Sequence, residues 1–178
     1  YGENPHQRAG LYAVRPDETP IGGEVLGGKE LSYNNLLDLD AAWRAVSLFE
    51  QPAVAVIKHL NPTGIAIGPT AADALPLAVA SDPVSAFGGV IAVNRTVDEA
   101  LVRALGSLFV EAIIAPDFAP TAQQLLGEQR RNCRLVRGPE PGLPRFELRS
   151  VVGGYLLQRP DLDDSNGTLW HVVTKRRP

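Results

Sequence analysis

Short runs of apolar residues, separated by segments of helical periodicity, constrain the fold of this chain more than any other feature. The runs Ala53 to Ile57, Gly89 to Val93 and Val110 to Ala115 are apolar almost throughout. They have the length of strands that are buried on both faces of a sheet. Because helical patterns lie between them, the sequence predicts an α/β fold in which flanking helices cover both faces of the sheet.

Three segments carry apolar residues at helical spacing, and each has polar residues suited to capping its first turn. The predicted helices are 36–46 with Asn34 or Asn35 as N-cap, 71–80 opened by Thr70 with Asp73, and 101–108 behind a capping box of Thr96 and Glu99. Further strands are expected at Gly10 to Val14 and Ile65 to Ile67, and strand or hairpin structure is expected over Phe146 to Leu157.

Composition narrows the class of protein. The chain has 178 residues and a formal net charge of −3, with acidic and basic residues mixed along it. This argues against nucleic acid as the main partner, since phosphate backbones recruit clustered Lys and Arg. The single cysteine, Cys133, excludes an intrachain disulfide. No apolar run approaches the roughly 20 residues that span a bilayer. We therefore expect a cytoplasmic domain without a membrane or nucleic-acid partner, and expect it to be a piece of a longer chain, because it begins at Tyr1 and contains no Met.

Polar residues that follow buried strands are the first candidates for chemistry, because ligands of open α/β sheets bind beyond the strand carboxyl ends. Lys58 and His59 follow one such strand, and Pro116 and Asp117 follow another. The turn from Ser85 to Gly89 precedes a strand instead. A lysine and a histidine together can stabilise a developing negative charge and carry a proton, as acyl transfer to an amine requires. The alternative is a solvated lysine and a histidine bonded to a backbone carbonyl.

Several apparent motifs do not carry a function. Gly23 to Lys29 has the spacing of a phosphate loop, but Glu30 stands where Mg²⁺ binding needs Ser or Thr, and no strand is expected before it. The zinc deaminase signature is absent. Asp161, Asp163 and Asp164 lack the rest of a calcium loop and are interpreted as a solvated acidic turn.

Six blocks of sequence resemble the AICAR transformylase domain of the bifunctional purine biosynthesis enzymes that also carry IMP cyclohydrolase. They run in family order along residues 1–178: Tyr1-Gly2-Glu3-Asn4-Pro5-His6-Gln7, Lys29-Glu30-Leu31-Ser32-Tyr33-Asn34-Asn35, Ile57-Lys58-His59-Leu60-Asn61-Pro62-Thr63-Gly64, Asp82-Pro83-Val84-Ser85-Ala86-Phe87-Gly88-Gly89, Ile113-Ile114-Ala115-Pro116 and Val172-Val173-Thr174-Lys175. The resemblance implies that 1–178 is the first half of such a domain, without its second half and without the cyclohydrolase domain. It also implies a mixed sheet with flanking helices of the cytidine deaminase type.

The implied reaction is transfer of the formyl group of 10-formyltetrahydrofolate to the 5-amino group of an aminoimidazole carboxamide ribonucleotide. By resemblance, His59 accepts or shuttles the proton of that amine. Lys58 stabilises the oxyanion or helps protonate the departing folate nitrogen, and these two roles stay open. The fragment alone is expected to be inactive.

The resemblance also implies substrate-binding roles for Tyr1, Asn35, Ser85, Phe87, Gly88 and Glu111. Tyr1 would lie near the phosphate or ribose, Asn35 at the nucleotide, Ser85, Phe87 and Gly88 at the base, and Glu111 at the ribose or base edge. Each has a structural alternative: a core aromatic for Tyr1, a helix cap for Asn35, chain reversal for 85–88, and a bonded mid-strand carboxylate for Glu111. His6 and His171 are interpreted as structural.

Other implications concern partners and rivals. The family has an arginine before the tyrosine, and here the chain begins at Tyr1, so a phosphate-binding cation is expected to be missing. A homodimer is implied for the parent protein, as is a monovalent cation near Val173 and Thr174. The rival interpretations are a nucleotide-binding module without catalysis, a zinc hydrolase and a dimerisation piece.

Overall fold

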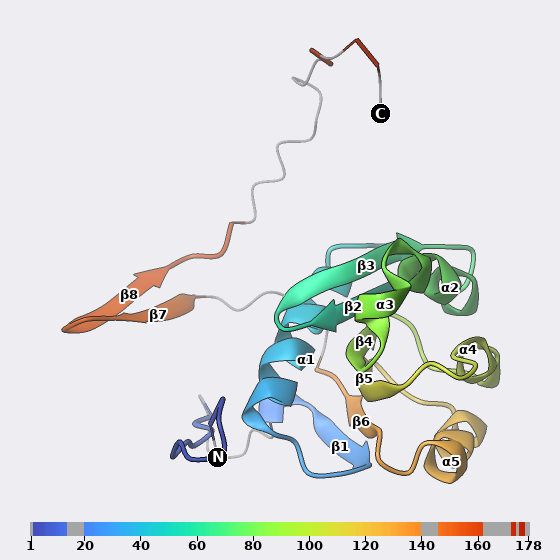
Figure 1. Ribbon diagram of the computed structural model, residues 1–178, viewed down its shortest axis with the longest axis horizontal. Coiled ribbons are helices and arrows are strands. Elements are labelled where there is room, and N and C mark those ends of the chain that lie inside the picture. Colours follow the sequence, from blue (N-terminus) through green and yellow to red (C-terminus); the bar gives the residue numbers. More distant parts are fainter. Residues whose placement is uncertain (1, 14–19, 140–145, 162–171, 174, 177–178) are drawn as a thin grey trace. The chain divides into compact units, whose positions relative to one another are not determined.

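The computed structural model describes residues 2–13, 20–139, 146–161, 172–173 and 175–176 (Figure 1). The chain divides into two compact units, Tyr1–Gly142 and Leu143–Pro178, and each is described by itself.

The first unit alternates strands and helices, as its apolar runs predict. In chain order its elements are the 3-10 helix Pro20–Gly22, β1 (Glu24–Gly27), α1 (Tyr33–Val46), β2 (Ala53–Lys58), β3 (Asn61–Ile67), α2 (Ala71–Ser81), α3 (Pro83–Ala86), β4 (Gly89–Val93), α4 (Glu99–Ala104), β5 (Val110–Ala115), α5 (Pro120–Gln129) and β6 (Arg134–Arg137).

The six strands form one mixed sheet in the order β1-β6-β5-β4-β2-β3 (Figure 1). Strands β4, β5 and β6 are parallel to one another. Strand β2 is antiparallel to both β3 and β4, and β1 is antiparallel to β6. The predicted mixed sheet with flanking helices is confirmed.

Helices cover both faces of this sheet, and each face has its own core. On one face α1 buries Leu39, Trp43 and Val46 against alternate residues of the central strands. On the other, α2, α4 and α5 bury a larger cluster that includes Leu75 and Leu101. Successive strand residues point to opposite faces, so strands such as β2 must be apolar throughout to serve both cores.

Asn94, just beyond β4, joins the end of α1 to the start of β2. Its Oδ1 accepts a hydrogen bond from the Ala53 N–H at 2.8 Å, and its Nδ2 donates to the carbonyls of Phe49 and Gln51, each at 2.8 Å. Asn94 is only 7% exposed, and these bonds satisfy a side chain that would be costly to bury unpaired.

Helix caps show where local sequence reasoning succeeded and where it was wrong. Thr70 caps α2 as predicted, its side chain accepting from the Asp73 N–H. The N-cap of α1 is Ser32, not Asn34 or Asn35: Ser32 and Asn35 form a capping box, which places Asn35 in the first turn. The N-cap of α4 is Asp98 rather than Thr96, and this helix ends at Ala104.

The strand expected over Gly10 to Val14 is also wrong for residues 10–13, which are irregular and exposed, while Val14 lies outside the described residues. Other elements were not predicted: the 3-10 helix Pro20–Gly22, the short helix α3, and β1, α5 and β6. Strands β1 and β6 are short, carry charged residues, and pair with each other through long-range contacts.

The second unit contains a hairpin of β7 (Glu147–Val151) and β8 (Gly154–Gln158), paired antiparallel. The hairpin expected over Phe146 to Leu157 is confirmed. Within the described parts of the chain, no helix is long and apolar enough to cross a bilayer.

Candidate functional site

The direction of β2 decides which polar residues meet. Because β2 is antiparallel to β4, the C-terminal end of β2 lies at the same end of the sheet as the N-terminal ends of β4, β5 and β6. This row of strand ends, which is different from the outermost strands, is the polar edge of the sheet. Lys58 therefore shares an edge with the Phe87–Gly88 turn and with Glu111. Pro116 and Asp117, the other polar candidates after a buried strand, follow β5 at the opposite end of the sheet, where Asp117 accepts from Arg137 Nε at 3.1 Å.

His59 is in a two-residue turn between β2 and β3. Lys58 pairs with Asn61 across this turn, and both His59 and Leu60 have positive φ, 52° and 65°. A two-residue loop of this kind is a type I′ turn, whose twist matches that of the paired strands. The turn presents the His59 side chain to solvent beyond the sheet edge.

The Lys58 side chain reaches along the edge to the next turn. Its Nζ donates a hydrogen bond to the Phe87 carbonyl oxygen at 2.7 Å. The Asp82 carboxylate, at the start of α3, is also near enough to interact with it electrostatically. The pKa of Asp82 lies below its ordinary value, chiefly because Ser85 donates side-chain and backbone hydrogen bonds to it, with Lys58 making the smallest contribution.

Phe87 and Gly88 form the tight turn that leads into β4. Gly88 has φ of 72°, which a residue with a side chain rarely adopts. Its N–H donates to the Phe109 carbonyl at 2.8 Å, which joins this turn to the start of β5. The rings of Phe87 and Phe109 lie 5.4 Å apart, tilted by 43°, and both remain substantially exposed. An exposed aromatic pair provides an apolar surface for a flat ligand.

Glu111 lies at an irregularity where β5 has one residue more than β4. Its carboxylate accepts a hydrogen bond from Arg134, at the start of β6, and Arg134 Nε also donates to the Glu30 carbonyl at 3.0 Å. The Glu111 side chain is 37% exposed and that of Arg134 13%. The structure thus gives Glu111 an arginine partner and leaves part of its carboxylate accessible at the edge.

The first turns of α1 lie at this same edge, since Asp38 of α1 accepts a hydrogen bond from the Leu60 N–H at 2.7 Å. Asn35 is one turn earlier on the same side of the helix. Its Oδ1 accepts from the Ser32 N–H at 3.1 Å. Asn35 therefore takes part in the cap as the third residue of the helix, but it is not the N-cap that the structural alternative predicted.

The opening motif of the sequence lies against α1 as well. Asn34 Nδ2 donates to the Glu3 carbonyl at 3.2 Å, and Gly2 and Gln7 close a turn through a backbone bond of 3.0 Å. Tyr1 itself lies outside the described residues.

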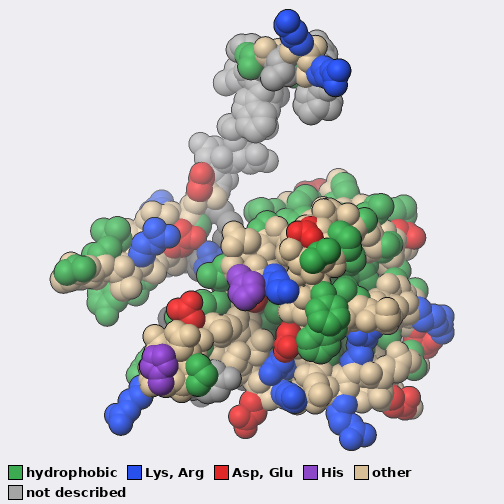
Figure 2. Space-filling view, viewed as in Figure 1, with side chains coloured by type: hydrophobic (Ala, Val, Ile, Leu, Met, Phe, Trp, Pro, Cys, Tyr) green, Lys and Arg blue, Asp and Glu red, His purple; other side chains and the backbone are tan. Residues whose placement is uncertain are grey.

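Chemically, this edge combines an amine, an imidazole, an aromatic surface and the N-terminus of a long helix. A helix N-terminus favours an anion such as a phosphate. Figure 2 shows a histidine and a basic side chain next to each other on the face in view, with hydrophobic side chains exposed nearby. Such a surface suits a small ligand that has both a flat ring and a negative charge.

Sequence reasoning missed Asp38, Phe109 and Arg134 at this edge. Asp38 could have been predicted, because it follows Asn35 by one helical turn and therefore lies on the same side of the helix. Arg134 gave no such signal, because β6 was not predicted.

The expected cation site lies largely outside the described residues. The monovalent cation was expected near Val173 and Thr174; Val173 is exposed and Thr174 lies outside the described residues. In the described part of the chain, no three His, Cys, Asp or Glu side chains are grouped closely enough to hold a metal ion.

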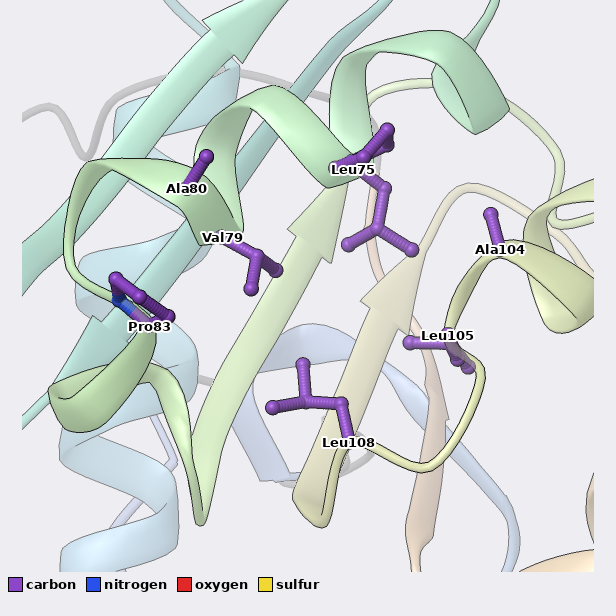
Figure 3. Close-up of a pocket in the computed structure, with 8 residues that line it drawn as sticks. Leu75, Val79, Ala80, Pro83, Ala104, Leu105 and Leu108 are labelled. Atoms are coloured by element: carbon purple, nitrogen blue, oxygen red, sulfur yellow. The ribbon is translucent and has the colours of Figure 1, made fainter.

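The unit also carries an apolar groove of about 390 Å³ between α2, α3, α4 and the segment after α4 (Figure 3). It is lined by Leu75, Pro76, Val79, Ala80, Pro83, Ala104, Leu105 and Leu108. None of these side chains can be charged or donate a proton, so the groove offers only apolar contacts.

The fold places the chain among α/β proteins whose mixed sheet is covered by helices on both faces, with polar and aromatic side chains gathered at one end of the sheet. The family model of the AICARFT/IMPCHase bienzyme matches residues 1–178, and the chain belongs to this family. Among its relatives is the bifunctional purine biosynthesis protein PurH of Desulfitobacterium hafniense, in strains DSM 10664 / DCB-2 and Y51. Each is 46% identical over 182 residues, covering 100% of this chain and 35% of the relative. The chain thus spans about a third of the length of these relatives.

Proposed function

We propose that this chain supplies the nucleotide-binding and proton-transferring part of a formyltransferase of purine biosynthesis. The substrate is 5-aminoimidazole-4-carboxamide ribonucleotide and the formyl donor is 10-formyltetrahydrofolate. The observation that supports this most directly is the meeting of Lys58, His59, Phe87 and Gly88 at one edge of the sheet. Family membership and the name of the PurH relatives support the choice of pathway.

In the proposed reaction the 5-amino nitrogen attacks the formyl carbon, and a tetrahedral intermediate forms. The amine loses a proton to His59, which lies at the tip of its turn and can reach a ligand from solvent. The bond between the formyl carbon and N10 of the folate then breaks, and N10 takes a proton. The Lys58 ammonium stabilises the charge that develops on the formyl oxygen, or supplies that proton.

Binding follows from the same geometry. The phosphate lies at the N-terminus of α1, near Asn35 and the turn that begins at Gly2. The flat imidazole carboxamide packs beside Phe87, where Gly88 permits close approach of the backbone. Glu111, held by Arg134, accepts from the ribose or base edge.

The remaining parts of the proposal concern the whole protein. We infer that residues absent from this chain complete the folate site, that the parent protein acts in the cytoplasm as a homodimer with a cyclohydrolase domain, and that the sheet belongs to the cytidine deaminase type. The isolated chain is accordingly expected to bind nucleotide without transferring a formyl group.

A calorimetric titration tests this proposal. We expect the aminoimidazole carboxamide ribonucleotide to bind the chain more tightly than AMP does, and Lys58→Ala with His59→Ala to weaken that binding at least about tenfold. In the full-length protein, either substitution alone should lower kcat for formyl transfer by about 100-fold or more, the range expected for a positioned proton-transfer group. Lys29→Ala, an exposed lysine on the loop before α1, is the matched control.

The results separate the alternatives. Nucleotide binding with no formyl transfer in the full-length wild type would favour a binding module without catalysis. Equal binding by the wild type and the double variant would remove Lys58 and His59 from the site.

A further inference from the structure

The turn that carries His59 has a backbone conformation that its own residues disfavour. Both central residues have positive φ, and neither is the Gly, Asn or Asp that such turns ordinarily use. Leu60 in particular gains no local hydrogen bond from its side chain in this region. A turn of this kind persists only when groups around it hold it in place.

Two side chains hold a single peptide group, the one between His59 and Leu60. Its N–H donates to Asp38 Oδ1 at 2.7 Å, and its carbonyl oxygen accepts from Asn61 Nδ2 at 2.8 Å. Because both ends of this group are bonded, it cannot rotate without breaking both bonds. Rotation would change φ of Leu60 and ψ of His59, and with them the position of His59 relative to Lys58.

The two holding groups differ in how firmly they are fixed. Asn61 belongs to the same hairpin and moves with the turn. Asp38 projects from α1, which buries Leu39 and Ala42 against the sheet. Its bond to Leu60 is also the stronger kind, because a carboxylate accepts from an N–H more strongly than a neutral oxygen does. Asp38 therefore connects the turn to a rigid reference outside the hairpin.

We propose that Asp38 is a positioning residue: it fixes the peptide after His59 and thereby places the imidazole for proton transfer. This inference rests on the function proposed above, in which His59 takes the proton of the attacking amine. Asp38 acts through the backbone N–H of Leu60 and does not contact substrate.

The test compares three variants of the full-length protein. Asp38→Ala removes the acceptor and should lower kcat about 10- to 100-fold, since small misplacements of catalytic groups have effects of that size, while KM for the nucleotide changes less than threefold. Asp38→Asn keeps an acceptor oxygen and should retain kcat within about fivefold. Asp40→Ala is the control: Asp40 lies two residues along α1 and pairs with Arg44 at 2.9 Å, and its loss should leave kcat within twofold.

Hydrogen–deuterium exchange of segment 58–61 gives a readout independent of catalysis. Exchange of this segment should become at least tenfold faster in Asp38→Ala and remain as in wild type in Asp40→Ala, with the rest of α1 and β2 unchanged. A variant that had merely lost stability would exchange faster throughout the sheet.

The outcomes are distinct. If Asp38→Ala folds and its kcat equals that of Asp40→Ala in an active protein, Asp38 does not position His59. If Asp38→Asn is as impaired as Asp38→Ala, the hydrogen-bond account is wrong. If the wild type transfers no formyl group, the proposed function fails, and unchanged exchange of 58–61 in Asp38→Ala would still overturn the positioning role. Should Asp38→Ala not fold, Asp38→Glu, which moves the carboxylate outward by one methylene, is expected to show the same loss of kcat, and full activity in that variant would count against the proposal.

Discussion

At the scale of single residues, the candidate site depends on short polar contacts that also fix the local backbone. Ser85 is an example. It was predicted to line the base pocket, and the structure shows it bonded to Asp82, whose Oδ1 accepts from the Ser85 N–H at 3.0 Å. Asp82 caps α3 in this way, and α3 leads directly into the Phe87–Gly88 turn.

The titration of Asp82 is a residue-scale prediction. We expect its pKa to lie below 3.8, and Ser85→Ala to raise it toward 3.8, because the Ser85 side-chain hydrogen bond is the largest cause of the shift. Lys58→Ala should raise it less, since the Lys58 charge is the smallest cause. Carbon-13 NMR titration of the carboxyl group measures both changes.

The sign of the accompanying stability change follows from the direction of the shift. The folded-state pKa is depressed, so the stabilisation is present above the unfolded value of 3.8 and is lost as pH falls through the folded value. A larger effect of Lys58→Ala than of Ser85→Ala would contradict this order of causes.

At the scale of elements, the candidate site needs β2 and β3 held firmly, because the turn that carries His59 joins them. Strand β3 is an outermost strand of the sheet, and α2 packs against it. The two meet at Gly64, where an added Cβ would lie 1.9 Å from the Ala78 carbonyl oxygen. Only a glycine allows helix and strand to approach this closely.

Gly64→Ala should therefore lower the free energy of unfolding by about 3 kcal/mol, at the upper end of overpacking effects. Urea denaturation measures it. Gly127→Ala is a matched control in α5, where an added Cβ meets nothing within 4 Å. It should raise the free energy of unfolding by up to about 1 kcal/mol, because Ala favours a helix more than Gly does. Equal effects of the two substitutions would show that the close contact at Gly64 is not rigid.

At the scale of the whole first unit, Cys133 reports on the packing between the sheet and its helices. The thiol is 5% exposed, and burial raises its pKa from 9.0 to about 12. It is the single cysteine of the sequence, so a thiol reagent can react with this side chain alone.

We expect Cys133 in the folded chain at pH 8 to react with a disulfide reagent at least about 100-fold more slowly than in the urea-unfolded chain, since the thiolate is both scarce and covered. Because the pKa of the folded-state thiol is raised, its contribution to the free energy of unfolding is fully present below pH 9.0 and is lost as pH rises toward 12. Similar reaction rates with and without urea would mean that this unit does not keep its core closed.

Prediction from sequence worked best where the signal was local or continuous. The central strands β2, β4 and β5 were found because they are apolar runs, and α2 because Thr70 and Asp73 form a recognisable cap. Strands β1 and β6 were missed because their residues carry charge and their pairing joins segments about 110 residues apart, such as Glu24 and Arg137. Short strands of this composition become strands through their partners, not through their own propensity.

The sequence by itself determined the α/β class and the sheet covered on both faces, and it named Lys58 and His59 as candidates for proton transfer. These follow from periodicity, turn chemistry and the properties of individual side chains, all of which are local. Tertiary structure decided that β2 runs antiparallel to β4, and so which polar residues share an edge. It placed Phe87, Glu111 and the start of α1 at the same end of the sheet as Lys58, left Pro116 and Asp117 at the opposite end, and brought Asp38 to the Leu60 N–H. Strand direction and helix placement depend on contacts between segments far apart in the chain, and no local pattern contains that information.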